Sequence, residues 1–205
     1  LAKIMTKYYI LLIISLIVVN SCSSTKQIES DIWDKEFKEC KDLELSNRIK
    51  NSFSPIKKTK VDSVKNIYTL FENFLLQKKI LKEISKNGYK DLLEKSFAKK
   101  ITSKTIFEFC EIMQTDVLMF FSPLSIKGCF GNTEYRYNQL KKEKNGWKYN
   151  FVLIIDKYES EGGFNENGLE ILKKSIDLIP DKKFNMEIYR RYILALVGTK
   201  GYHEQ

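Results

Sequence analysis

The sequence predicts an α+β fold: a predominantly helical single domain with one antiparallel β-hairpin. Apolar residues recur at three- and four-residue steps through most of the chain, as they do in amphipathic helices. Two segments rich in Tyr, Phe, Val and Ile, 133–140 and 147–158, flank a polar turn that ends in Asn145-Gly146, a dipeptide typical of a tight hairpin. There is no internal repeat and no low-complexity tract, so we expect residues 31–205 to form one globular domain.

The first half of this domain carries two long helical patterns. Segment 31–50 has apolar residues at rough helical spacing with opposite charges between them, and a loop is expected at 51–60. The strongest pattern covers 63–86, with one broad apolar face. Asp62 is a suitable N-cap for that helix, and Asn87-Gly88 supplies a left-handed stop.

Four shorter helices are expected around the hairpin. Two precede it, at 89–97 and at 103–114, the latter with an optional extension to 121 before Pro123. A polar loop at 161–168 follows the hairpin. In the next helix, 167–179, Asn167 and Glu170 have the spacing of a capping box, and the last helix is expected at 185–197.

Three of the four cysteines lie in the body of the chain, at positions 40, 110 and 129. A Cys110–Cys129 bridge would close a loop of about twenty residues and stabilise the domain by about 3 kcal/mol. Cys40 and Cys110, however, are spaced along apolar helical faces and are typical of small buried hydrophobes. The sequence therefore favours no obligatory disulfide and leaves the Cys110–Cys129 pairing open.

The sequence predicts no catalytic residue, no metal ligand and no cofactor. His203 is the only histidine and lies near the end of the chain, where a relay of Ser or Cys with His is not expected. No Cys-x-x-Cys or His-Glu-x-x-His motif occurs, and Gly162-Gly163 lacks the lysine of a phosphate-binding loop. The carboxylate pairs Glu108/Glu111 and Asp156/Glu159 have no feature that distinguishes them from ordinary surface acids.

Two further sets of residues were weighed as binding sites. The acids and amides from Asp156 to Asn167 offer oxygen ligands for calcium, but they do not fit the EF-hand template, and a polar turn before a helix is favoured. Aromatic side chains of the hairpin provide a possible platform for sugar or peptide, although a role in the core is favoured: Tyr135, Tyr137, Trp147 and Tyr149.

The formal net charge of +9 does not indicate nucleic-acid binding. Arginine occurs only at positions 48, 136, 190 and 191, whereas recognition of phosphates and base edges relies heavily on the arginine fork. The remaining basic residues are lysines. They favour a solvated surface, with weak attraction to an anionic membrane face or an acidic polysaccharide.

The N-terminal stretch carries the clearest functional signal. Lys3 and Lys7 precede an apolar run of twelve residues from Tyr8 to Val19, which has the length of a signal-peptide core and is too short to span a bilayer comfortably. The run ends in Val19-Asn20-Ser21-Cys22. This segment resembles the signal of bacterial lipoproteins, with Asn20 as its one departure from the usual pattern.

The resemblance implies cleavage between Ser21 and Cys22 by signal peptidase II, and attachment of diacylglycerol and an N-acyl chain to Cys22. We then expect residues 1–21 to be a signal peptide, with Met5 an alternative start, and residues 22–30 to be a lipidated tether. The expected location is the bacterial cell envelope, anchored in the outer membrane and facing the periplasm.

We therefore expect a non-enzymatic, lipid-anchored envelope protein that binds or scaffolds another component. The expected partners are the membrane, through the lipid, and an envelope protein or polysaccharide, with no nucleic acid. An immunity or inhibitor protein of the periplasm is an alternative, and a hydrolase that depends only on carboxylates is a weaker one.

Overall fold

The structure is a computed structural model that describes residues 33–47, 66–113, 129, 146–161 and 163–203. The chain divides into two compact units, residues 1–40 and 41–205. The first unit is described only through residues 33–40, which are helical. All other described residues belong to the second unit.

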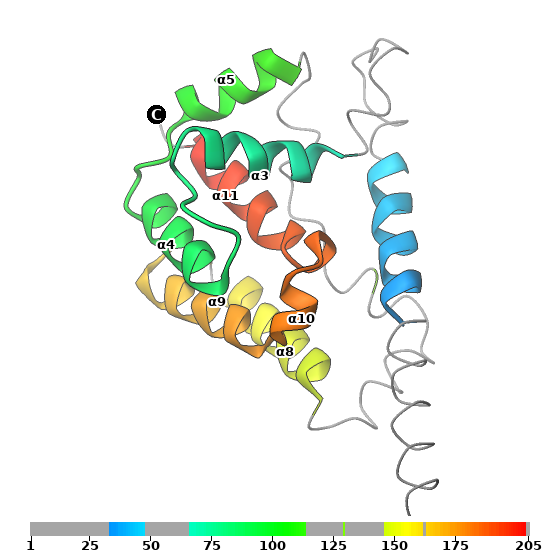
Figure 1. The fold of residues 1–205 in the computed structure, drawn as a ribbon. Coiled ribbons are helices and arrows are strands. Elements are labelled where there is room, and N and C mark those ends of the chain that lie inside the picture. The colour runs from blue at the N-terminus through cyan, green and yellow to red at the C-terminus, as the bar shows by residue number, and fades with distance from the viewer. Residues whose placement is uncertain (1–32, 48–65, 114–128, 130–145, 162, 204–205) are drawn as a thin grey trace, which may run out of the picture. The chain divides into compact units, whose positions relative to one another are not determined.

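The described elements of the second unit are all helices, joined by turns and short loops (Figure 1). Its elements are the rest of helix 33–47, then α3 (Ile67–Gln77), α4 (Lys86–Phe97), α5 (Ser103–Met113), α8 (Trp147–Ser160), α9 (Glu166–Leu178), α10 (Asp181–Phe184), the 3₁₀ helix η3 (Glu187–Tyr189) and α11 (Arg191–His203).

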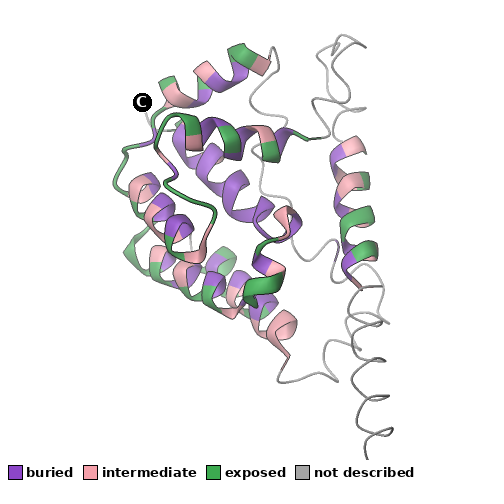
Figure 2. Cartoon of the chain, viewed as in Figure 1, coloured by how far each residue is buried: buried purple, intermediate pink, exposed green. Residues whose placement is uncertain are grey.

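Helix α11 forms the core of this unit, since it is buried on nearly all sides (Figure 2). It contacts α3, α4 and α5, while α9 packs between α4 and α8. A helix that is apolar all round is stable only when neighbours cover every face, and these helices provide the cover. Near its end, Gly201 allows a close approach of α5, because a Cβ at this position would lie 3.0 Å from Ile106 Cγ1.

The expected α+β class is wrong for the described residues, which contain no strand. Segment 147–158, expected to be the second strand, lies within α8. Its buried positions Phe151, Val152, Ile155 and Tyr158 follow helical steps, so packing overrides the β-propensity of the aromatic and branched residues. The first expected strand, 133–140, falls outside the described residues.

The expected helix 63–86 is shorter than its pattern indicates. Helix α3 ends at Gln77, and Lys79 adopts a left-handed φ of 56°, which turns the chain away. Ser85 then caps a new helix by accepting a hydrogen bond of 3.0 Å from Gly88 N. The Asn87-Gly88 pair therefore lies in the first turn of α4 and does not terminate a helix. Asp62, the expected cap, is outside the described residues.

Position 88, in the first turn of α4, has no room for a side chain. A Cβ there would lie 2.2 Å from the carbonyl oxygen of Glu83, a distance that no real Cβ reaches. The glycine is needed for a close backbone approach at the start of α4, and its φ lies outside the left-handed region.

The remaining helices agree with the sequence to within a few residues, with one exception. Helices α4, α5 and α9 lie at the expected places, although Asn165 caps α9 where Asn167 was expected. The expected helix 185–197 is replaced by α10, η3 and α11. Gly198, expected to end it, is buried inside α11. Within the described ranges, no helix has the length and apolarity needed to cross a membrane.

Candidate functional site

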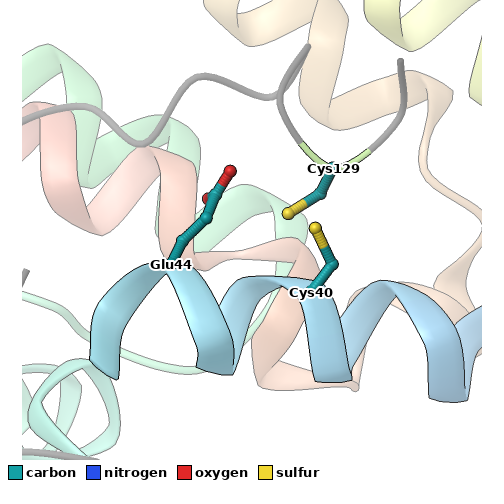
Figure 3. Close-up of side chains that lie close together, drawn as sticks. All are labelled: Cys40, Glu44 and Cys129. Carbon is teal, nitrogen blue, oxygen red and sulfur yellow. The ribbon is translucent and has the colours of Figure 1, made fainter. Parts of the chain in front are cut away.

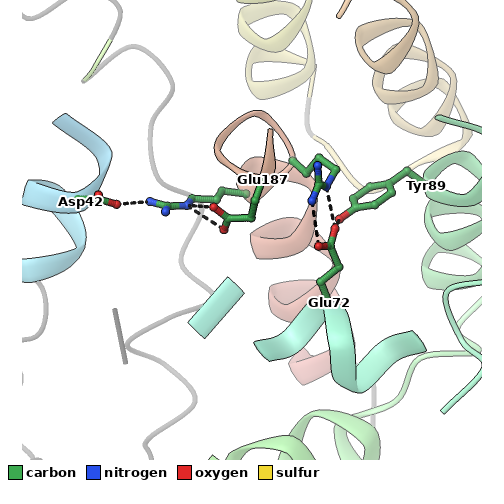
Figure 4. A network of polar contacts seen from close by, with 6 residues as sticks. Asp42, Glu72, Tyr89 and Glu187 are labelled. Carbon is green, nitrogen blue, oxygen red and sulfur yellow. Dashed lines mark hydrogen bonds and ion pairs between the residues drawn. The ribbon is translucent and has the colours of Figure 1, made fainter. Parts of the chain in front are cut away.

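The second unit contains a buried group of polar side chains, which we call the charge centre: Glu72 from α3, Tyr89 from α4 and Arg190 from the turn before α11 (Figure 4). Glu72 is 2% exposed and Arg190 4% exposed. Arginine Nε lies 2.7 Å from Glu72 Oε1, and Nη2 lies 2.9 Å from Oε2. The Tyr89 hydroxyl donates a further hydrogen bond to Glu72 Oε1. A single carboxylate is thus held by donors from two other elements.

The remaining guanidinium nitrogen of Arg190, Nη1, also has a hydrogen-bond acceptor in the charge centre. Arg190 Nη1 donates to the carbonyl oxygen of Phe184, at 2.6 Å. The guanidinium also lies 5.9 Å from the ring centroids of both Tyr89 and Phe184, which pack edge to face. These rings exclude water, and in a dry environment each charge-assisted hydrogen bond is stronger than it is at a surface.

The charge centre holds its protonation states firmly. Burial raises the pKa of the Tyr89 hydroxyl well above its ordinary value, and the charge of Glu72 raises it further. Burial alone would lower the pKa of Arg190, but hydrogen bonds to Glu72 and the charge of that carboxylate outweigh it and the pKa is raised. Tyr89 therefore stays neutral and Arg190 stays charged, which suits a structural ion pair better than proton transfer.

A second arginine, Arg191, makes its own ion pairs next to the charge centre. Its Nε lies 2.9 Å from both carboxylate oxygens of Glu187, and its Nη1 lies 2.8 Å from Asp42 Oδ1. The guanidinium also stacks over the ring of Tyr68, at 5.9 Å. Burial lowers the pKa of Arg191, and the two acids more than compensate, so the side chain remains charged.

In the polar loop that offers oxygen ligands for calcium, Asn165 and Glu161 use side-chain oxygens in local contacts. Asn165 Oδ1 accepts the hydrogen bond of Gly168 N at 2.7 Å and so caps α9. Asn167 Nδ2 donates to Glu161 Oε2 at 2.7 Å, and Lys157 pairs with Glu161 at 3.7 Å. These contacts order the turn that precedes α9.

The carboxylate pairs Glu108/Glu111 and Asp156/Glu159 both lie on helices. Glu108 and Glu111 lie on α5, where Lys78 binds Glu108. Asp156 and Glu159 lie near the end of α8, at a place where a strand was expected. His203 is exposed at the end of α11 and packs against Tyr202.

The aromatic platform does not exist as expected, because its described half is helical. Trp147, which is half-buried, packs against Tyr189 at 5.3 Å and against Phe151 at 6.4 Å. Tyr149 is half-buried on the same helix. Tyr135 and Tyr137 lie outside the described residues.

The cysteines differ from expectation. Cys110 is buried and forms no disulfide, so the Cys110–Cys129 bridge is wrong. Cys40 and Cys129 are both in the disulfide-bonded state, so the view of Cys40 as an unpaired hydrophobe is also wrong.

Cys40 and Glu44 extend from the same face of helix 33–47 (Figure 3). As disulfide sulfurs, the two cysteines offer no thiolate to a metal ion. Ser21 and Cys22, the expected processing and lipidation residues, lie outside the described residues.

Sequence reasoning missed all three residues of the charge centre. The one available signal was the adjacent pair Arg190-Arg191 in a chain whose basic residues are mostly lysines. Arginine is the cation best suited to buried ion pairs, so such a pair indicates a buried ionic contact. No protein-family model matches the chain, and no match was found among curated proteins or solved structures.

Proposed function

We propose that this protein is a lipid-anchored component of the bacterial cell envelope whose helical body binds or scaffolds another envelope component without catalysing a reaction. The anchor rests on the N-terminal sequence, in which an apolar run is followed by Ser21 and Cys22. Two or more acyl chains at one cysteine would make anchoring stable, because each buried CH2 contributes about 0.8 kcal/mol.

The charge centre is the observation that supports a non-catalytic body. A catalytic carboxylate needs access to substrate and a pKa matched to proton transfer. Glu72 lacks such access, since it is buried and its oxygens already accept from Arg190 and Tyr89. The most strongly built polar cluster of the described residues is therefore used to join helices.

Labelling with palmitate in cells tests the anchor. We expect wild-type protein to take up label and to sediment with membranes, whereas Cys22→Ala should lose both properties. Cys110→Ala is the matched control, because it removes a buried cysteine that forms no disulfide, and it should keep the label. Equal labelling of wild type and Cys22→Ala would end the lipoprotein proposal.

Site-specific photo-crosslinking tests the binding role. Photoreactive residues at the exposed positions Phe107 on α5 and Leu153 on α8 sample two different helices of the body. We expect one position to give a discrete adduct with an envelope protein or polysaccharide in intact cells, and Cys22→Ala to lose it. A hydrolytic activity of the purified chain that disappears on a single Asp or Glu substitution would contradict the non-catalytic part of the proposal.

A further inference from the structure

A regular series of ion pairs, which we call the ion-pair ladder, joins α4 to α9 and to the first residue of α10. Its three pairs have nitrogen–oxygen distances of 2.7, 2.5 and 2.8 Å, respectively: Lys86–Asp181, Lys90–Asp177 and Glu94–Lys173. Each step of four residues forward along α4 is matched by a step of four residues back along the partner segment. This is the pattern of two antiparallel helices whose facing residues recur once per turn.

The lysines of the ion-pair ladder are held close to the protein surface. Their side chains are 23–25% exposed, whereas the side chains of the three acids are 52–89% exposed. The lysine stems therefore lie against the helices and direct their ammonium groups to the acids. A hydrogen bond to Glu94, followed by one to Glu170, raises the pKa of Lys173, so this member of the ladder stays charged.

The polarity of the ion-pair ladder reverses at its third pair. Helix α4 contributes the cation to the first two pairs and the anion to the third. A slide of α9 by one turn in one direction would place Glu94 opposite Asp177. A slide in the other direction would place Lys90 opposite Lys173. Each slide thus creates a like-charge contact and keeps only one attractive pair, and like charges at this spacing are unfavourable.

The apolar faces of the two helices distinguish these arrangements less sharply. On α4 the buried residues Tyr89 and Leu93 are four positions apart, and on α9 the same is true of Leu172 and Ile176. A slide of one turn, about 5.4 Å, therefore brings apolar positions opposite apolar positions again. Slides of one turn between packed elements are a known form of conformational change.

We propose that the ion-pair ladder is a register lock, which prevents α9 from sliding along α4 by one turn. Three attractive pairs form in only one arrangement, and the reversed pair makes both slid arrangements repulsive. Charges on facing helices set the pairing of coiled coils in the same way. Because α8 packs against α9, the lock also sets the position of α8 and of its exposed Leu153 relative to α4.

Double electron–electron resonance on the full chain measures the register directly. Spin labels are attached to ketone-bearing residues at the exposed positions Asn87 on α4 and Glu166 on α9, so that the native cysteines stay unmodified. These positions lie toward opposite ends of the α4–α9 contact, so a slide changes their separation mainly along the helices. We expect one distance population in the wild type.

Glu94→Lys should release the lock in one direction, because the new lysine is repelled by Lys173 and attracted by Asp177 after a slide. We expect a second population that is longer by about 5 Å. The loss of one partly exposed pair should also lower the Tm by about 2–4 °C. The matched control is Glu111→Lys, which makes the same charge reversal at an exposed position of α5 and should keep the single wild-type distance.

Glu94→Lys/Lys173→Glu separates the lock from simple stabilisation. It restores three attractive pairs but gives them one polarity, so a slide would keep two attractive pairs and create no like-charge contact. Because Glu170 also pairs with Lys173, this comparison is made in a Glu170→Gln background. We expect the Tm to recover while additional distance populations remain. The proposal is overturned if either variant keeps the single wild-type distance, since apolar packing would then set the register, or if Glu111→Lys gains the second population.

Discussion

Replacing Arg190 with methionine should destabilise the protein by about 3–5 kcal/mol, because it leaves the Glu72 carboxylate buried without its cation. Methionine approximates the length of the arginine stem and has no charge. The cost therefore comes mainly from electrostatics and lost hydrogen bonds, with little contribution from a cavity. Both side chains of the pair are within 4% of full burial, so water cannot take the place of the guanidinium.

The structure shows how this magnitude arises. Arg190→Met removes two hydrogen bonds to Glu72 and one to the carbonyl oxygen of Phe184. Glu72 then retains only the Tyr89 hydroxyl among the described donors of the charge centre. For a domain of this size a loss of 1 kcal/mol lowers the Tm by roughly 2–4 °C, so the expected decrease is about 6–20 °C.

Urea unfolding followed by circular dichroism at 222 nm measures the effect, with an unchanged m-value showing that only stability has changed. The double variant Glu72→Met/Arg190→Met is the decisive comparison, because replacing both members of a buried pair with apolar residues is often close to neutral. We expect it to be more stable than Arg190→Met alone. A loss below about 1 kcal/mol in Arg190→Met, or a double variant that is less stable than the single one, would refute the description of the pair as buried and mutually dependent.

Two further predictions concern a helix cap and alkaline pH. Asn165→Ala should lower the unfolding free energy by about 1 kcal/mol in urea, because it removes the cap of α9, whereas Asn167→Ala, which loses only an exposed contact to Glu161, should stay within about 0.5 kcal/mol. The folded-state pKa of Tyr89 lies above the unfolded value of 10.0, so its contribution to stability is fully present below that pH and is lost as the pH rises further. Urea titrations from pH 8 to pH 11 should therefore show a steeper loss of stability above pH 10 in wild type than in Tyr89→Phe, and equal slopes would contradict this.

The helices that the sequence predicted well are those whose ends carry local signals. Segment 103–114 corresponds to α5, and 167–179 corresponds to α9, because apolar spacing and polar caps act within a few residues of one another. The cap of α9 was misplaced by two residues, from Asn165 to Asn167, since both amides precede the same apolar face. Local sequence patterns predict that a helix is present more accurately than they predict the residue at which it begins.

The hairpin prediction failed because local propensity and packing disagree in segment 147–158. Aromatic and β-branched residues favour a strand when they are considered alone. In the structure the same residues line one side of α8, which packs against α9. Packing against α9 favours the helix over the strand, and the residues of α9 lie outside segment 147–158.

The charge centre was not predictable from a local pattern at all. Glu72 and Arg190 are separated by 118 positions, and neither stands in a motif. Tyr89 was treated only as the beginning of a helix.

The distance along the chain between Glu72 and Arg190 has a consequence for the order of folding. A growing chain produces α3 long before it produces the turn that carries Arg190, and α11 supplies much of the surface against which the earlier helices pack. Until then, burying Glu72 would leave an anion without its cation, so a compact state lacking the last helix is penalised. The charge centre therefore disfavours stable collapse until Arg190 has been synthesised, and a chain truncated before residue 190 should remain open to proteolysis.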